Sequence, residues 1–165
     1  HDPLRRTVRK LDQGTRFDLG GIAKGYAVDR AVANLIALGI SSAMIDLGGN
    51  LFCLGLPEGR DAWRVGIRDP LDRDQLFATV GLVNQAVATS GSYERFVEID
   101  GRRYGHIMNP ATGRPAEGLL SATVVARSAT VADGLSTTLF VLGPEAAAAL
   151  LRDYYRNVEA VLSEG

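Results

Sequence analysis

The sequence predicts an α+β domain with a mostly antiparallel sheet and helices packed on it. Two observations favour this class. Short apolar, β-branched runs separated by turn residues recur through the middle of the chain, and three longer segments keep the apolar spacing of a helix. The chain has 165 residues, 46% of them hydrophobic, so it can bury one substantial core. Because no linker or low-complexity segment divides it, we expect residues 1–165 to form a single domain.

The helices are expected at residues 23–38, 130–142 and 144–155. Gly39 follows the first helix, where a left-handed residue commonly ends a helix. Thr130 is the expected N-cap of the second helix, with Asp133 at its third position in an arrangement close to a capping box. Gly143 and Pro144 end the second helix and begin the third.

Extended segments account for most of the remaining chain. Asp100 and Gly101 are a strong signal for a tight hairpin. The small polar residues Ser90, Gly91 and Ser92 are expected to interrupt the β pattern. The expected extended or strand segments are residues 7–11, 15–19, 43–47, 51–56, 63–67, 77–83, 85–89, 96–99, 104–108, 120–126 and 158–162.

Composition excludes several functional classes. The net charge is −1, with 18 basic and 19 acidic residues, so we expect neither a nucleic-acid surface nor a polybasic membrane surface. No apolar run reaches the roughly 20 residues of a membrane helix, so no membrane segment is expected in this chain. Cys53 is the only cysteine, which excludes a disulfide framework; its apolar surroundings predict a buried, inert thiol.

A glycine turn at residues 18–25 is the first candidate site. Gly20 and Gly21 carry no Cβ and precede a helix whose first amides have no helical partners, so a phosphate or a metal-bound phosphate can approach the backbone there. Lys24 adds a positive charge. Paired glycines before a helix are also common in plain tight connections, and this motif alone favours that alternative. The glycine turn matches neither the Gly-x-Gly-x-x-Gly motif of dinucleotide-binding folds nor the nucleotide phosphate loop that ends in Gly-Lys-Ser/Thr.

A second candidate is the pair Asp133 and Thr137, which lie four positions apart and so share one face of a helix. A carboxylate and a hydroxyl are oxygen ligands, which suit Mg²⁺ better than Zn²⁺. The alternative is structural: Asp133 caps its own helix and Thr137 bonds back to a helical carbonyl. By spacing alone, the structural alternative is favoured.

His106 precedes an Asn-Pro-Ala-Thr-Gly loop at the expected end of a strand. A neutral imidazole there can accept a proton from a hydroxyl nucleophile near neutral pH. A hydrogen-bonded structural histidine is an equally good interpretation. Ser90 and Ser92 do not predict a serine nucleophile, because no Gly-x-Ser-x-Gly elbow is present.

Five blocks taken together resemble the bacterial FAD:protein FMN transferases, the ApbE family, formerly labelled thiamine-biosynthesis lipoproteins. The blocks occur in the order found in that family, which makes their combination far more specific than any one of them. They are Asp-Leu-Gly-Gly-Ile-Ala-Lys-Gly-Tyr-Ala-Val-Asp at 18–29, Asp-Leu-Gly-Gly-Asn at 46–50, Thr-Ser-Gly-Ser-Tyr at 89–93, His-Ile-Met-Asn-Pro-Ala-Thr-Gly at 106–113 and Ala-Asp-Gly-Leu-Ser-Thr-Thr-Leu-Phe at 132–140.

The resemblance implies the flavin-transferase fold, which is T-fold-like, and an enzyme that uses Mg²⁺ and takes FAD as substrate. Such an enzyme transfers FMN to a Thr or Ser hydroxyl of an acceptor protein and releases AMP. Two alternatives stay open: a Mg²⁺-dependent hydrolase that converts FAD to FMN and AMP, and a flavin-binding module without turnover. Family members are considerably longer, so we expect this chain to correspond to the carboxy-terminal half, incomplete at its N-terminus.

The resemblance also implies roles for individual residues. His106 would be the catalytic base that deprotonates the acceptor hydroxyl. Family members usually act outside the cytoplasmic membrane, often lipid-anchored, so a periplasmic or other extracytoplasmic location is the expectation for the parent protein. The implied metal ligands are Gly21, Asp133, Ser136 and Thr137, and the implied FAD contacts are Asp18, Gly20, Lys24, Asp46, Ser90, Gly91 and Ile107.

Overall fold

The centre of the fold is an antiparallel sheet of five strands, in a computed structural model that describes residues 1–72, 74–92 and 96–164. The strand order is β1-β2-β5-β10-β11, and every neighbouring pair runs antiparallel. The predicted α+β class with a mostly antiparallel sheet is confirmed. The strands are β1 (Ala43–Leu47), β2 (Asn50–Leu54), β5 (Gln85–Gly91), β10 (Leu119–Ala126) and β11 (Glu159–Glu164).

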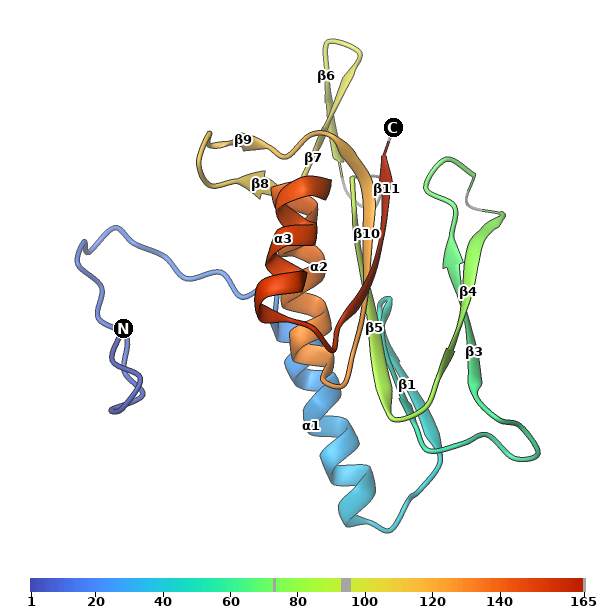
Figure 1. The fold of residues 1–165 in the computed structure, drawn as a ribbon. Helices are drawn as coiled ribbons and strands as arrows, with labels where there is room; N and C mark the ends of the chain where they lie inside the picture. Colours follow the sequence, from blue (N-terminus) through green and yellow to red (C-terminus); the bar gives the residue numbers. More distant parts are fainter. Residues whose placement is uncertain (73, 93–95, 165) are drawn as a thin grey trace.

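One face of this sheet is covered by helices α1 (Ala23–Ala37), α2 (Ala129–Leu142) and α3 (Pro144–Tyr154), as Figure 1 shows. Helix α2 contacts β5, β10, α1 and α3, which explains why it is apolar around most of its circumference. Phe140 and Leu139 of α2 pack with Val28 of α1 and Phe52 of β2 in the main core. Among the described residues, no helix is both long and apolar enough to cross a membrane.

The opposite face carries a hairpin of β3 (Trp63–Arg68) and β4 (Leu76–Leu82). Val65 and Leu82 of this hairpin pack with Val87 and Cys53 of the sheet in a second apolar cluster. The Cys53 side chain is 0% exposed, and burial raises the pKa of its thiol to about 11. The predicted burial of Cys53 is confirmed, and a raised pKa disfavours the thiolate, which is the reactive form.

Two smaller hairpins follow β5. Asp100 and Gly101 both have positive φ angles, 52° and 75°, in the turn that joins β6 (Phe96–Ile99) to β7 (Arg102–Gly105). The hairpin predicted at this dipeptide is confirmed. The single strand predicted at 104–108 is wrong. Strand β7 ends at Gly105, and pairing resumes in β8 (Met108–Asn109). The two strands belong to different hairpins, because β7 pairs with β6 whereas β8 pairs with β9 (Arg114–Pro115).

The expected interruption of the β pattern at Ser90 and Gly91 is also wrong. Both residues belong to β5, where Ser90 pairs with Ala122 and Gly91 with Ser121 of β10. Cross-strand pairing within a central strand overrides the weak strand propensity of small polar residues. Tyr93, the last residue of the third sequence block, lies outside the described residues.

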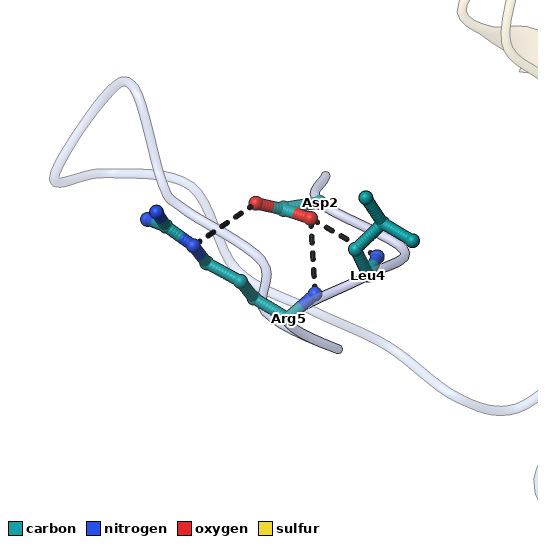
Figure 2. A network of polar contacts seen from close by, with 3 residues as sticks. All are labelled: Asp2, Leu4 and Arg5. Atoms are coloured by element: carbon teal, nitrogen blue, oxygen red, sulfur yellow. Dashed lines mark hydrogen bonds and ion pairs between the residues drawn. The ribbon is translucent and has the colours of Figure 1, made fainter.

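The N-terminal segment before α1 forms no strand within the described residues, so the strands predicted at 7–11 and 15–19 are wrong. An alternating pattern forms a strand only where a neighbouring strand pairs with it. The only pairing here is an isolated bridge between Asp2 and Thr7. Figure 2 shows how Asp2 closes this bend: its Oδ1 accepts hydrogen bonds from the amides of Leu4 and Arg5, each at 3.0 Å, and its Oδ2 lies 3.7 Å from Arg5 Nε.

The helix ends agree with the predictions except at the start of α2. Gly39 adopts the expected positive φ, 81°, just beyond α1. The N-cap of α2 is Ser128, whose hydroxyl accepts a hydrogen bond from the Val131 amide, so the assignment of Thr130 as N-cap and the capping-box role of Asp133 are wrong. Because the helix begins at Ala129, Asp133 lies beyond its first turn and is available for another contact.

Candidate active site

The two helices that carry the candidate residues touch at a glycine. Gly25, in the first turn of α1, is buried, and a Cβ there would lie 2.2 Å from the Ala129 carbonyl oxygen and 2.7 Å from Asp133 Cβ. Only glycine allows α1 and α2 to approach this closely. Its amide donates a hydrogen bond to Asp133 Oδ2 at 2.8 Å. Sequence reasoning missed Gly25; the available signal was a glycine inside a helical pattern, which often marks close packing.

Asp133 therefore does not cap its own helix, and the structural alternative for this residue is wrong. Its side chain is 4% exposed and satisfies an amide at the start of α1, one of the groups that a helix leaves unpaired. In the described part of the chain, its other carboxylate oxygen, Oδ1, accepts no hydrogen bond. One oxygen of Asp133 thus joins the helices, while the second has no hydrogen-bond donor among the described residues.

Asp29 of α1 makes the reciprocal contact with the start of α2. Its carboxylate accepts hydrogen bonds from the amides of Ala129 and Thr130 and from the hydroxyls of Ser128 and Thr130, at 2.6–2.9 Å. Partial burial acts to raise the pKa of Asp29, but the hydrogen bonds, led by those from Thr130 and Ser128, outweigh it and hold the pKa below its ordinary value. Each helix thus provides a carboxylate for the first turns of the other, which fixes their relative position.

Three hydroxyl groups converge next to this junction. Ser90 Oγ of β5 lies 2.9 Å from Ser136 Oγ and 3.1 Å from Thr137 Oγ1 of α2. The Ser136 hydroxyl also donates to the Asp133 carbonyl at 2.9 Å, whereas Thr137 Oγ1 lies 3.5 Å from that carbonyl, the long limit for a hydrogen bond. Thr137 thus makes the back-bond that the structural alternative expects, at a long distance, and has a closer polar contact with Ser90 in addition.

The glycine turn before α1 lies against the same threonine. A Cβ at Gly21 would lie 3.5 Å from Thr137 Oγ1, so the backbone of the turn approaches the hydroxyl closely. The neighbouring Gly20 donates its amide to Asp18 Oδ1 at 2.6 Å, which orders the turn. Sequence blocks more than 100 residues apart thus meet here: Gly21, Asp133, Ser136 and Thr137 lie together, with Ser90 beside them.

The other expected residues lie outside this cluster. Lys24 and Asp46 are exposed, and in the described ranges neither is joined to the cluster by a hydrogen bond or ion pair; Asp46 Oδ1 instead accepts from the Gly49 amide at 2.9 Å. His106 is exposed between β7 and β8. Ile107 is packed into the main core, and its carbonyl accepts a hydrogen bond from the Ala116 amide at 2.8 Å. The structure thus assembles the expected metal ligands more completely than the expected flavin contacts.

The donor atoms in the cluster are all oxygens. Residues 1–72, 74–92 and 96–164 contain no group of three or more His, Cys, Asp or Glu side chains able to hold a metal. A cation at this position would therefore meet one carboxylate, one threonine hydroxyl and main-chain carbonyls, which is a donor set for Mg²⁺ rather than for Zn²⁺. The residues present fit a hard divalent cation.

Comparison with known proteins gives the family. The model of the ApbE family matches residues 1–162. The chain belongs to the ApbE family. It is 47% identical over 158 residues to the FAD:protein FMN transferase of Treponema pallidum, covering 90% of this chain and 44% of that protein. It is 38% identical over 150 residues to the protein of the same name from Escherichia coli K12, covering 90% of this chain and 43% of that protein.

Solved structures of ApbE proteins share the fold. The ApbE protein of Thermotoga maritima superimposes with a TM-score of 0.83 at 38% identity, over 91% of this chain and 49% of that one. The Pseudomonas stutzeri flavinyl transferase ApbE in its apo form gives a TM-score of 0.74 at 39% identity, over 91% and 47%. This ApbE chain thus spans less than half the length of the relatives that it matches.

Proposed function

We propose that this ApbE chain takes part in Mg²⁺-dependent transfer of FMN from FAD to a Thr or Ser hydroxyl of an acceptor protein, with release of AMP. Relatives up to 47% identical are named FAD:protein FMN transferases, which supports flavin transfer as the reaction class. The observation that carries the proposal is the meeting of Asp133, Thr137 and Gly21 from two distant sequence blocks. Such a set of oxygens can hold a divalent cation, and the cation would offset the negative charge of a phosphate.

In this proposal the metal ligands are Asp133 Oδ1, Thr137 Oγ1 and the main-chain oxygens of Gly21 and Ser136. Mg²⁺ held there would offset the negative charge of the FAD phosphates and so favour attack at phosphorus. Ser90 orients the Thr137 hydroxyl through their 3.1 Å contact. The Gly25 amide holds the Asp133 carboxylate so that its second oxygen faces the ligand.

The flavin nucleotide would lie against the glycine turn of α1. Gly20 lets the phosphates approach the backbone, and the exposed Lys24 supplies a cation for them. Asp18 keeps the turn in shape through the Gly20 amide. The remaining proposed flavin contacts are Asp46, Ser90, Gly91 and the main chain at Ile107.

His106 is the proposed base. Its imidazole accepts the proton of the acceptor hydroxyl while that oxygen bonds to the phosphorus nearest the flavin. The bond from this phosphorus to the oxygen that bridges to the second phosphate breaks, and AMP leaves with that oxygen. The acceptor then carries FMN as a phosphoester, and the proton on His106 is released to solvent.

The test incubates the chain with FAD, Mg²⁺ and a threonine-containing candidate acceptor, and measures acceptor mass and free AMP. The proposal expects an acceptor mass gain equal to one FMN phosphoester, and its loss in Asp133→Asn. Asp153→Asn, an exposed carboxylate on α3, is the matched control and should leave the yield unchanged. Equal yields from Asp133→Asn and the unaltered chain would contradict the metal assignment.

Other outcomes identify the alternatives. AMP released in the absence of an acceptor means FAD hydrolysis, and FAD bound without either product means a flavin-binding module. If calorimetry detects no binding of FAD, then flavin transfer, FAD hydrolysis and the flavin-binding module are all overturned. On the resemblance alone, we also propose that the parent protein acts outside the cytoplasmic membrane, which cell fractionation of the parent protein would test.

A further inference from the structure

Asn50, the first residue of β2, has an amide group without a partner. The residue is 2% exposed, and its Nδ2 is shielded from solvent yet meets no hydrogen-bond acceptor among the described residues. It is the only such buried side-chain atom in the described ranges. Buried amide groups are almost always paired, because an unmade hydrogen bond there destabilises the fold. An unpaired donor at this position therefore needs an explanation.

The side chain of Asn50 lies on the helix-covered face of the sheet. Phe52 and Leu54, its neighbours at alternate positions of β2, belong to the main core beneath the helices. Cys53, at the intervening position, belongs to the cluster under the β3–β4 hairpin. Since side chains of a strand alternate between faces, Asn50 shares the face of Phe52 and Leu54.

The connection from α1 into the sheet places Asn50 at the end where α1 begins. Helix α1 leads from its C-terminus into β1, and β1 turns back through residues 48–49 into β2, as Figure 1 shows. The start of β2 is therefore level with the N-terminal part of α1, which packs on β1 and β2. The glycine turn that contains Gly21 precedes this part of α1.

Strand pairing brings Asn50 close to the hydroxyl cluster. Leu51 of β2 pairs with Val87 of β5. Continuing this antiparallel register by one residue places Asn50 opposite Ala88, two residues before Ser90 on the same face of β5. Diagonal neighbours of this kind lie roughly 7–8 Å apart, within reach of an intervening ligand. On this register Asn50 is a diagonal neighbour of Ser90, and Ser90 contacts Thr137 and Ser136.

We propose that Asn50 is a further ligand-binding residue of this site, and that its Nδ2 donates a hydrogen bond to a phosphate oxygen of FAD bound with Mg²⁺. An amide NH₂ needs an acceptor, and the phosphates carry the highest density of acceptor oxygens in that ligand. Bonds to ionised oxygens are stronger than neutral ones, especially where water is excluded. This inference rests on the proposed function, and it adds Asn50 to the residues that the proposed function assigns to ligand binding.

The test compares the unaltered chain with Asn50→Leu, which keeps the size of the side chain and removes the donor. Calorimetry measures the Kd of FAD, and separately of inorganic pyrophosphate, each with Mg²⁺; thermal unfolding is measured without ligand. We expect Asn50→Leu to unfold at the same or a higher temperature and to bind both ligands at least tenfold more weakly. Asn34→Leu, at an exposed position of α1, should bind both as the unaltered chain does.

Each further outcome has a defined meaning. Unchanged affinity in Asn50→Leu overturns the inference and indicates that Nδ2 serves only the fold, for example through a buried water. If Asn50→Leu fails to fold, Asn50→Ala removes the amide without adding bulk and is judged by the same tenfold criterion. Failure of the unaltered chain to bind FAD overturns the proposed function itself, which distinguishes that failure from failure of Asn50 alone.

Discussion

The carboxylate of Asp133 in α2 accepts a hydrogen bond from the amide of Gly25 in α1 at 2.8 Å, although the two residues are 108 positions apart in the chain. Asp29 makes the reciprocal contact, from α1 to the first amides of α2. These two carboxylates fix the relative position of the helices and with it the approach of Gly21 to Thr137. The predictions below separate this structural role from ligand binding.

Replacing Gly25 should destabilise the fold strongly. In Gly25→Ala the new Cβ would lie 2.2 Å from the Ala129 carbonyl oxygen, so α1 and α2 must move apart and the Asp133 contact is weakened. We expect a loss of about 3 kcal/mol in the free energy of unfolding, measured by urea denaturation.

Gly134→Ala is the control for this substitution. It lies inside α2, where the nearest atom that a Cβ would meet outside the helix, among the described residues, is Ile22 Cδ1 at 3.8 Å. Alanine there should stabilise the helix by roughly 0.5–1 kcal/mol. Similar effects of the two substitutions would show that the helix contact at Gly25 is not tight.

Asp133→Asn should separate the two roles of this carboxyl group. The asparagine carbonyl can still accept the Gly25 amide, so the free energy of unfolding should fall by only about 1 kcal/mol. The lost charge should weaken Mg²⁺ binding, measured by calorimetry, at least tenfold. Asp133→Ala removes both functions and should show both losses. Mg²⁺ affinity that survives in Asp133→Asn would argue against the carboxylate as a ligand.

The hydroxyl of Ser90 should matter for the metal more than for the fold. Ser90→Ala removes the 3.1 Å contact with Thr137 Oγ1, which leaves that hydroxyl free to rotate. Loss of such an orienting partner typically weakens metal affinity by about tenfold or more. The matched control is Thr138→Ala; the exposed Thr138 hydroxyl donates to the Gly134 carbonyl and has no contact with the cluster among the described residues. Equal Mg²⁺ affinities of the two variants would contradict an orienting role for Ser90.

Asp29 should make stability depend on pH in acid. Its folded-state pKa lies below the ordinary value of 3.8, so its contribution is fully present above that value and is lost as the pH falls through the lower, folded-state pKa. Asp29→Asn should therefore cost about 1 kcal/mol of unfolding free energy at pH 7, and the difference from the unaltered chain should shrink below pH 4.

Urea denaturation of both proteins across pH 2–7 measures this effect. Asp12→Asn, at an exposed position in the N-terminal segment, is a control that should change stability little at any pH. A difference for Asp29→Asn that stays constant through acid pH would show that the capping hydrogen bonds do not depend on the charge.

Much of the fold followed from local sequence. The hairpin at Asp100 and Gly101 was predicted correctly because positive φ angles at both turn positions suit these residues. Helix α1 and strand β1 were located almost to the residue, since periodicity and Gly39 mark their limits. Predictions failed where pairing decided the outcome. Ser90 lies inside β5 because β10 is beside it, and residues 7–11 form no strand because their only pairing among the described residues is the isolated bridge of Thr7 with Asp2.

For the candidate site, the sequence by itself determined the family blocks and the shared helix face of Asp133 and Thr137. It could not decide whether Asp133 caps its own helix, because helix-end contacts of an aspartate look alike in sequence. Only the tertiary structure decided this, by bringing Gly25 close enough for its amide to bond the carboxylate. The unpaired amide of Asn50 was likewise invisible in sequence, because burial and partner atoms depend on how strands and helices pack.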